Sequence, residues 1–334
     1  MIHGHGSTRG TPHEAPLFPD PAAAAGLAGP VAARAESRWR PARPVRLVVP
    51  VAAGGSQDAV ARILAGPLAA RLGQVVMVEN LPGAAGNLGF QTVARARPDG
   101  TALLAGSDGL SINKTLFPRL DFDPVGDFAP VSWVVRVPQI LVVRADGAAA
   151  DLAAFLRAAR REGPAVGTTG IGSLAHLLGE VMQDAAGLRW LHVPYRGGAQ
   201  AVNDLLAGTL DAALVNIGAA TGLVRQGAFR ALAVSSAERV RALPAVPTLA
   251  EAGLPVGPVV GWHGIVAPVG TDPAICACLD AGVQAALEST GIAARLVALG
   301  LEPVAESPAR LAETIRDDAE RWGAVIRRAR IVPA

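Results

Sequence analysis

A loop of small residues near the start of the chain carries the first groups that could hold a ligand. The segment Gly54-Gly-Ser-Gln-Asp58 follows a short apolar run, Leu47–Val51, and precedes a helical pattern, Ala59–Leu72. Glycine lets the backbone turn sharply and lets a ligand approach the main chain. The first amides of a helix have no partner within the helix, and the helix dipole favours negative charge there. The segment therefore predicts a site for an anion or a carboxylate, with Asp58 either capping the helix or organising the loop.

Other loops share this pattern, because each follows a short apolar run that is typical of a strand. They are Asn80–Gly89, Gly106–Gly109, Thr169–Ser173 and Pro194–Gly198. In open α/β sheets, ligands bind outside the carboxyl ends of the strands, so we expect these loops to lie around one ligand. The candidate ligand-binding residues are Ala53, Gly54, Gly55, Ser56, Asp58, Gly86, Asn87, Ser107, Asp108, Thr169, Gly170, Gly172, Ser173, His176, Tyr195, Arg196, Gly197, Val215 and Asn216.

Two groups of these loops are expected to hold the two polar ends of the ligand. Amides near Gly54–Ser56 and Gly86–Asn87 would hold a carboxylate, and the loop Thr169–Ser173 would hold the other end. Hydrogen bonds to a charged group contribute about 1.5–3 kcal/mol each, so four or five of them suffice for micromolar affinity after ordering costs. Arg196 is the best candidate for direct charge pairing, and solvent exposure is its alternative. For Tyr195, contact with the ligand and a purely structural role are both open.

The elements that must position these loops alternate between short strands and helices from Arg43 onward. This order predicts an α/β fold with mostly parallel sheets. Two such series occur, and the chain crosses between them near residues 137–140 and 257–262. We therefore expect residues 41–138 plus 258–334 to form one domain and residues 139–257 to form the second. Two crossover segments would make a hinge with the ligand cleft between the domains.

Composition excludes several classes of protein. The chain has 334 residues, 51% of them hydrophobic and 17% charged, so it is not a disordered chain. The net charge of +2 is too small to indicate nucleic-acid binding. Cys276 and Cys278 fall in a helical pattern and point to different sides, so neither a disulfide nor a metal pair fits them. No apolar run reaches the roughly 18 residues that span a bilayer.

Residues 1–40 are expected to lie outside the fold. Residues 21–33 are weakly apolar, and Ala33-Arg34-Ala35 matches a small-x-small cleavage site. Arg9 is the only basic residue before this run, which is unusual for an export signal. A degenerate signal peptide and an unstructured leader are both open.

Catalysis and metal binding are not expected. Ser173 and His176 suggest a hydrolase pair, but the chain has no Gly-x-Ser-x-Gly elbow, so His176 is expected to support its loop. The segment Gly83–Gly89 has the wrong glycine spacing for a dinucleotide, and no Gly-Lys pair exists for a phosphate loop. We expect no cofactor, no resident metal and a monomer.

Several segments resemble the substrate-binding proteins of tripartite tricarboxylate transporters, also called the Bug family. The resemblance covers residues 41–330 in the family's order. The segments that carry it include Arg43–Pro50, Gly54–Asp58, Leu72–Gly89, Pro98–Gly100, Ile112–Asn113, Phe128–Val131, Gly170–His176, His192–Gly197, Arg230–Val234, Leu243–Gly253 and Ala267–Thr271.

The resemblance implies a type II periplasmic binding protein fold, with two α/β domains joined by two crossover strands around a ligand cleft. It also implies capture of a small carboxylate in the periplasm for the membrane subunits of a transporter, without catalysis. A ligand sensor that docks on a receptor could have the same cleft, and an enzyme that uses it is a further alternative.

Two positions depart from the usual family pattern. The loop before Ile112 carries Asp108 in place of a neutral polar residue, and Val215-Asn216 replaces the acid and asparagine that often end the strand. If both positions face the cleft, a negative charge has moved from one wall to the other. The pocket would then prefer different distal groups on its ligand; the alternative is that Asp108 faces water.

Overall fold

The computed structural model describes residues 39–304 and 306–333. Residues 1–38, and with them nearly all of the expected leader, lie outside the described residues. Trp39 belongs to the fold, because its indole packs against Gly100 and the core around Ile275. The fold therefore includes Trp39 and Arg40, the last two residues of the expected leader.

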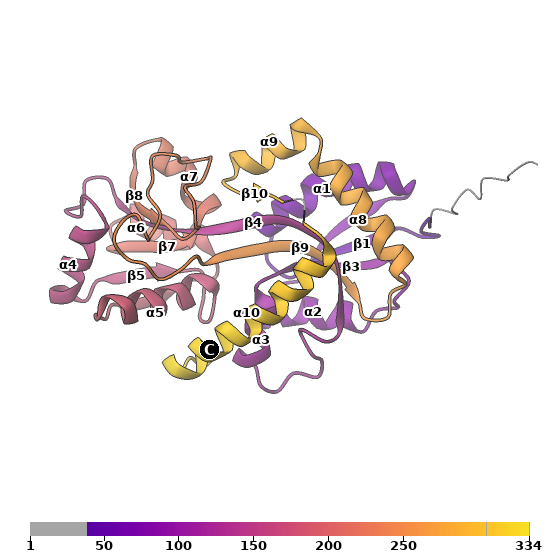
Figure 1. Cartoon of the computed structure of the whole chain (residues 1–334), viewed down its shortest axis with the longest axis horizontal. Helices are drawn as coiled ribbons and strands as arrows, with labels where there is room; N and C mark the ends of the chain where they lie inside the picture. The colour runs from indigo at the N-terminus through magenta and orange to yellow at the C-terminus, as the bar shows by residue number, and fades with distance from the viewer. Residues whose placement is uncertain (1–38, 305, 334) are drawn as a thin grey trace, which may run out of the picture. The chain divides into compact units, whose positions relative to one another are not determined.

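The strands and helices alternate along most of the chain (Figure 1). The strands are β1 (Val45–Val49), β2 (Val76–Asn80), β3 (Ala102–Ser107), β4 (Phe128–Arg144), β5 (Ala165–Thr168), β6 (Leu191–Pro194), β7 (Ala212–Asn216), β8 (Phe229–Val234), β9 (Val260–Pro268) and β10 (Glu302–Pro303). The helices are α1 (Ser56–Leu72), α2 (Asn87–Ala94), α3 (Gly109–Leu116), α4 (Leu152–Glu162), α5 (Leu174–Ala186), α6 (Gly198–Leu206), α7 (Ile217–Arg225), α8 (Pro273–Leu287), α9 (Thr290–Ala298) and α10 (Pro308–Ala329), with a short 3₁₀ turn, η1 (Ala84–Gly86), before α2.

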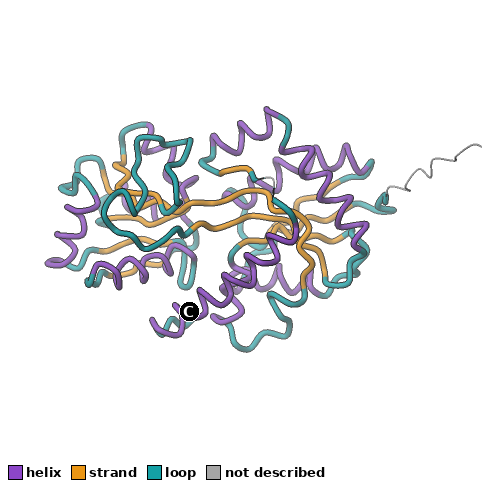
Figure 2. Tube along the Cα trace, in the orientation of Figure 1, coloured by secondary structure: helices purple, strands orange, loops and turns teal. Residues whose placement is uncertain are grey.

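The strands pair in the order β2-β1-β3-β9-β4-β7-β5-β6, and β8 and β10 also pair with β4. The pairs β1–β2, β1–β3, β5–β6 and β5–β7 are parallel, as the alternation of strands and helices predicts. Every pair that involves β4 or β9 is antiparallel. The expected mostly parallel sheets are therefore joined by two long antiparallel strands, β4 and β9, which run side by side across the molecule (Figure 2).

Strand β4 is continuous where the sequence predicts two strands separated at Pro138. Residues Phe128–Pro138 pair with β9, and residues Gln139–Arg144 pair with β7 on one side and β8 on the other. Proline cannot donate to a ladder, and within sheets it is confined to edges and bulges. Pro130 lies at a bulge, and Pro138 is the last residue opposite β9 before the strand joins β7. Both prolines thus occupy places where the ladder changes.

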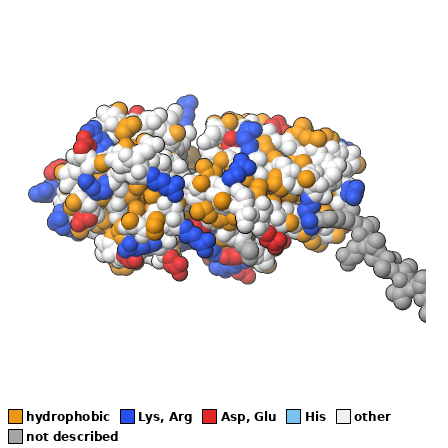
Figure 3. All heavy atoms as spheres, turned by 90° about the horizontal axis from the view of Figure 1, so that it is seen from above, with side chains coloured by type: hydrophobic (Ala, Val, Ile, Leu, Met, Phe, Trp, Pro, Cys, Tyr) orange, Lys and Arg blue, Asp and Glu red, His pale blue; other side chains and the backbone are white. Residues whose placement is uncertain are grey.

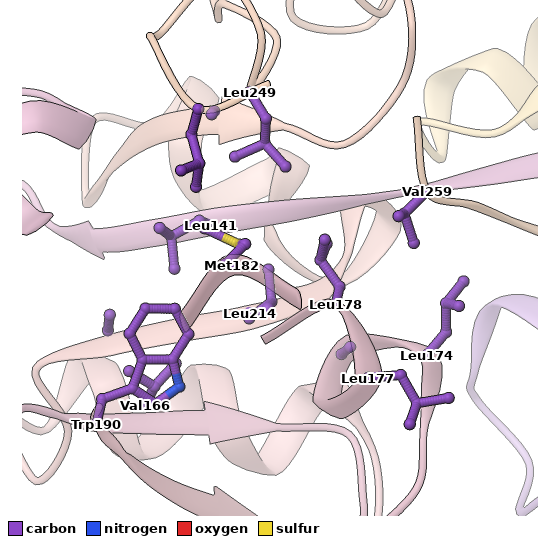
Figure 4. Close-up of a cluster of buried hydrophobic side chains, with 14 of the residues drawn as sticks. Leu141, Val166, Leu174, Leu177, Leu178, Met182, Trp190, Leu214, Leu249 and Val259 are labelled. Carbon is purple, nitrogen blue, oxygen red and sulfur yellow. The ribbon is translucent and has the colours of Figure 1, made fainter. Parts of the chain in front are cut away.

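Apolar side chains fill both faces of the sheet. Successive residues of β4 point to opposite faces, so Leu141 and Val143 belong to one cluster and Ile140 and Val142 to another. Figure 4 shows Leu178 and Met182 of α5 beside Leu141 and Leu214. Each such side chain contributes about 1.5–3 kcal/mol when it is fully buried. This packing fixes α5, and with it the loop Thr169–Ser173 that precedes the helix.

Helix α10 contacts both α3 and α5, which carry loops from the two series of strands. Leu311 and Ile315 pack with the core around β3 and β9, whereas Trp322 and Ile326 pack with the core that contains α5. The C-terminal helix therefore joins both cores. In the part of the chain that the structure describes, no helix combines the length and hydropathy needed to cross a bilayer.

Candidate functional site

Asp58 fixes the first glycine loop, Gly54–Ser56, through hydrogen bonds. The Asp58 carboxylate accepts hydrogen bonds from the Gly54 amide at 3.0 Å, from Asn80 Nδ2 at 2.9 Å and from Arg62 Nε at 3.0 Å. Burial alone would raise the pKa of Asp58, but these hydrogen bonds hold it below its ordinary value. Helix α1 begins after Gly55 without a side-chain cap, so Asp58 organises the loop and does not cap the helix.

This arrangement corrects the expected role of one amide. The Gly54 N–H is already bonded to Asp58 and is not available to a ligand. The amides of Gly55 and Ser56 make no hydrogen bond within the described residues, and Ala53 is exposed beside them. The loop therefore offers the start of α1 as its donor, in line with the general anion affinity of helix N-termini.

Ser56 contacts His263, which is not among the expected site residues. Ser56 Oγ lies 3.0 Å from His263 Nε2, and His263 stands opposite Ser107 in the β3–β9 ladder. Burial lowers the pKa of His263 to about 4, so its imidazole is neutral at pH 7. Two hydroxyl groups and a neutral imidazole thus meet at the carboxyl end of β3. Only the pairing of β3 with β9 reveals this neighbour, which lies 207 positions from Ser56.

The second glycine loop also differs from expectation. The Gly86 amide donates to Gly83 O and the Asn87 amide to Ala84 O, so both are used within the turn. The Asn87 side chain is buried, and its Oδ1 accepts a hydrogen bond of 2.9 Å from Asn113. Asn87 Nδ2 has no partner within the described residues. The donor offered here is therefore a side-chain amide, which Asn113 orients.

Asp108 lies where the two series of loops meet. A β-carbon added at Gly261 of β9 would lie 3.0 Å from Asp108 Oδ1 and 3.0 Å from Leu174 Cδ2. Asp108 precedes α3, and Leu174 is the first residue of α5. The C-terminal end of α3 meets the other loop as well, because Leu116 contacts Gly172. Loops from both series thus share one region around Gly261.

Two carboxyl groups near Gly261, those of Asp108 and Asp318, have raised pKa values. Burial, and secondarily the Asp318 carboxylate of α10, raises the pKa of Asp108 to about 7. Burial likewise raises the pKa of Asp318 to about 6. The indole N–H groups of Trp262 and Trp322 lie near Asp318, yet neither makes a hydrogen bond within the described residues. Asp108 is therefore partly protonated near neutral pH and is not a fully solvated surface acid.

The loop Thr169–Ser173 offers amides from the second series. The amides of Gly172 and Ser173 are occupied, since they donate to His176 Nδ1 and to Gly170 O. Those of Thr169 and Gly170 make no hydrogen bond within the described residues. The Thr168 hydroxyl beside them is fully buried and also lacks a partner there. Of the expected donors, the Thr169 amide therefore remains free together with that of Gly170, whereas the Gly172 and Ser173 amides are used within the loop.

Tyr195 and Arg196 differ in whether their polar groups are available to a ligand. The Tyr195 hydroxyl donates to Asp204 Oδ2 at 2.7 Å, and burial and this carboxylate raise the pKa of Tyr195 to about 12. Its hydroxyl is thus already engaged. Arg196 is exposed, and its guanidinium makes no ion pair within residues 39–304 and 306–333. Gly197, which follows Arg196, has a φ of 132° and is the N-cap residue of α6.

Val215 does not face a cleft. It is fully buried in the core between β7 and α6, and a β-carbon on Gly198 would contact both Val215 and Thr169. Asn216 is partly exposed and is the N-cap residue of α7. Val215 therefore contributes to the core of this domain and not to a ligand-facing wall.

His176 supports its loop, as expected, but it also has unexpected neighbours. Its Nδ1 accepts the Gly172 amide at 3.0 Å, and its Nε2 lies 3.8 Å from Glu180 Oε1. His192 Nε2 lies 3.0 Å from the same oxygen. Sequence spacing between His176 and His192 did not indicate this group, because it is the packing of α5 against β6 that brings the histidines together.

A separate cavity of about 660 Å³ lies away from these loops, with Arg136, Glu238, Arg241 and Glu302 in its lining. None of the expected site residues lines it. The surface seen in Figure 3 carries interspersed basic, acidic and apolar side chains. The glycine loops, with their free amides and hydroxyls, remain the better place for a small anion.

Comparisons with known proteins identify the family to which the chain belongs. A family model described as "Tripartite tricarboxylate transporter family receptor" matches residues 60–331. The chain is 38% identical to "Protein BugT" of Bordetella pertussis over 309 residues, which are 91% of this chain and 94% of that protein.

Solved structures of periplasmic binding proteins have the same fold as this chain. "Periplasmic binding protein BugD" has a TM-score of 0.79 and 34% identity, over 88% of this chain and 100% of that one. MatC from Rhodopseudomonas palustris with bound malate has a TM-score of 0.78 and 33% identity, over 86% and 99%. Rpa4515 of R. palustris with adipate has a TM-score of 0.82 and 33% identity, over 88% and 99%. The fold is thus that of the periplasmic binding proteins.

Proposed function

Because the chain belongs to the family of tripartite tricarboxylate transporter receptors, we propose that it is an extracytoplasmic solute-binding protein. It captures a small dicarboxylate between its two series of loops and delivers it to the membrane subunits of such a transporter. It binds its ligand without chemical change.

The observation that carries this proposal is the convergence of loops around Gly261. Asp108 before α3 and Leu174 at the start of α5 both contact this glycine of β9, and Gly172 contacts Leu116. A ligand held there can bond to donors from both series at once. Such a ligand stabilises the arrangement in which the loops are close, which is the basis of hinge closure.

A dicarboxylate suits the donors on either side. One carboxylate faces the Gly55 and Ser56 amides with Asn87 Nδ2, and the other faces the Thr169 and Gly170 amides with Arg196 nearby. The relatives MatC and Rpa4515 were solved with malate and adipate, which both have two carboxyl groups. Asp108 disfavours negative charge beside it, so we expect a ligand whose middle or distal part carries a hydroxyl or an amine.

Thermal-shift and calorimetric titration with malate, adipate and matched monocarboxylates tests this proposal. We expect a dicarboxylate to bind with micromolar affinity, about 8 kcal/mol, and to raise the midpoint of unfolding by mass action. The Ser56 hydroxyl, which lies beside His263, is a further donor to the first carboxylate. Ser56→Ala keeps the amide but removes this hydroxyl, so it should weaken binding by roughly tenfold to a hundredfold, the effect of one charge-assisted hydrogen bond.

Ser289→Ala is the matched control, since Ser289 is exposed and its side chain makes no capping bond. A flat response to every carboxylate would overturn the ligand class. For delivery, cross-linking in native membranes should capture a transporter subunit; capture of a receptor kinase in its place would overturn that part.

A further inference from the structure

His176, Glu180 and His192 form a compact group outside the proposed carboxylate site. One ligand atom from each lies within 4.8 Å of the others. His176 and Glu180 are one helical turn apart on α5, and His192 lies on β6 with its ring centroid 4.3 Å from that of His176. Their side chains are 12%, 18% and 12% exposed, so the group is shielded yet reachable.

This group opens onto a cavity of about 310 Å³. Ile171 and Pro194 line it on one side, and the C-terminal residues 329–332 line it on the other. A small ion and one or two waters can enter such a space. Two imidazoles and one carboxylate around an accessible position form the ligand set of known zinc sites that keep one coordination position for water.

The hydrogen bonds of the group are in conflict without a cation. His192 Nε2 lies 3.0 Å from Glu180 Oε1 and 2.8 Å from Gln183 Nε2. Gln183 Oε1 accepts the Trp190 amide, so its Nε2 is a donor. One ring nitrogen cannot donate to the carboxylate and accept from the amide at once. A metal ion removes the clash between the nitrogen and the carboxylate, because both then direct lone pairs at it, and the Gln183 amide can donate instead to Glu180 Oε1, 3.4 Å away.

The donor set also narrows the choice of ion. Imidazole favours zinc, copper and nickel, and a carboxylate completes a mixed nitrogen and oxygen ligand set that such ions accept.

We propose that His176 Nε2, Glu180 and His192 Nε2 bind a divalent first-row transition-metal ion, with zinc as the reference ion. His192 Nδ1 is buried without a partner in the described residues, so outer-shell support is incomplete. We therefore expect micromolar affinity and not the tighter binding of a fully supported site.

Metal binding would act on the loop that precedes α5. A neutral imidazole that binds metal through Nε2 carries its proton on Nδ1, and His176 Nδ1 now accepts the Gly172 amide. The metal-bound form therefore loses this hydrogen bond and loosens Thr169–Ser173. This consequence rests on the proposed function, because that loop is assigned to the carboxylate.

Zinc titration by calorimetry and cobalt(II) titration by visible absorption test the site in the full chain. His3, His5 and His13 are replaced by glutamine in every sample, so that the histidines of the N-terminal segment cannot bind the added metal. We call this triple-glutamine protein the background, and we expect it to bind one equivalent of zinc. Glu180→Gln and His192→Gln should each reduce the zinc affinity of the background at least about tenfold. Glu162→Gln, on the exposed end of α4, is the matched control and should bind zinc with the affinity of the background.

The proposal would be overturned if the background showed no saturable zinc binding, or if both site variants bound zinc with the same affinity as the background. Circular dichroism without metal verifies folding, and Glu180→Gln decides the result if His192→Gln does not fold. Saturating zinc should weaken dicarboxylate binding roughly threefold to tenfold, the effect of one neutral hydrogen bond. Unchanged dicarboxylate affinity would overturn the coupling. Absence of dicarboxylate binding with or without zinc would overturn the proposed function and leave the metal site standing.

Discussion

At the level of single residues, the raised pKa of Asp108 links the stability of the protein to pH. A solvated aspartate is ionised at neutral pH, whereas this one lies against Gly261 and near Asp318 and has a pKa of about 7. The native state therefore keeps a proton that the unfolded chain releases above pH 4. The stability that this proton contributes is present at pH 4 and is lost as the pH rises through about 7.

Asp108→Asn should therefore gain stability relative to the parent protein as the pH rises from 4 to 8. Asparagine fills the same space and has no proton to lose, so the midpoint of unfolding should exceed that of the parent by a few degrees at pH 8. Thermal unfolding at four pH values measures this. Asp121→Asn, at an exposed aspartate far from Asp318 in the sequence, is the control and should show no such trend. An Asp108→Asn difference that is the same at pH 4 and pH 8 would contradict the burial argument.

At the level of elements, Gly89 of α2 is needed because two backbones meet there. A β-carbon at Gly89 would lie 3.0 Å from Pro50 Cα and 3.1 Å from Leu81 O, and neither atom can move independently. Gly89→Ala should lower the free energy of unfolding by about 1–3 kcal/mol. Gly222 of α7 is exposed and has nothing within 4 Å of a β-carbon, so Gly222→Ala should raise it by about 0.5–1 kcal/mol. Urea unfolding measures both, and equal effects would contradict this account.

Much of the element order follows from the sequence, and the failures have local causes. The strand, loop and helix around Gly54–Asp58 form as expected, because apolar periodicity and glycine punctuation agree there. Helix α3 was not among the helices expected from the sequence, and serine, asparagine and threonine in Ser111–Thr115 are weak helix formers. It forms because Leu110 and Ile112 are buried in the cores that α3 joins.

The site was predictable in its loops but not in its individual donors. Glycine patterns identify where the backbone turns, and those turns do lie at the carboxyl ends of strands. Which amide remains free depends on contacts such as Asp58 with Gly54 or His176 with Gly172. The partnership of Ser56 with His263 depends on strand pairing across most of the chain, which no local pattern encodes. The domain boundaries near residues 138 and 258 stay predictions, since residues 39–334 form one compact unit.

At the level of the whole molecule, Gly261 controls how closely α3 and α5 approach. A side chain there would contact both Asp108 and Leu174. Gly261→Val should hold the loops apart and weaken dicarboxylate binding by at least about tenfold, which is roughly 1.4 kcal/mol. Titration calorimetry measures the affinity, and small-angle scattering should show a smaller ligand-induced compaction than in the parent protein. Unchanged affinity in a folded variant would mean that the ligand does not draw these helices together.

The path of β4 also limits how this architecture can be divided. Strands β7 and β8 both pair with residues Gln139–Arg144, the distal end of a strand whose other end is held by β9. A fragment cut after Arg144 would leave β7 and β8 without the strand between them. Recombining halves from two relatives must therefore transplant this strand whole. A crossover placed inside it would join two ladders whose registers were never selected together.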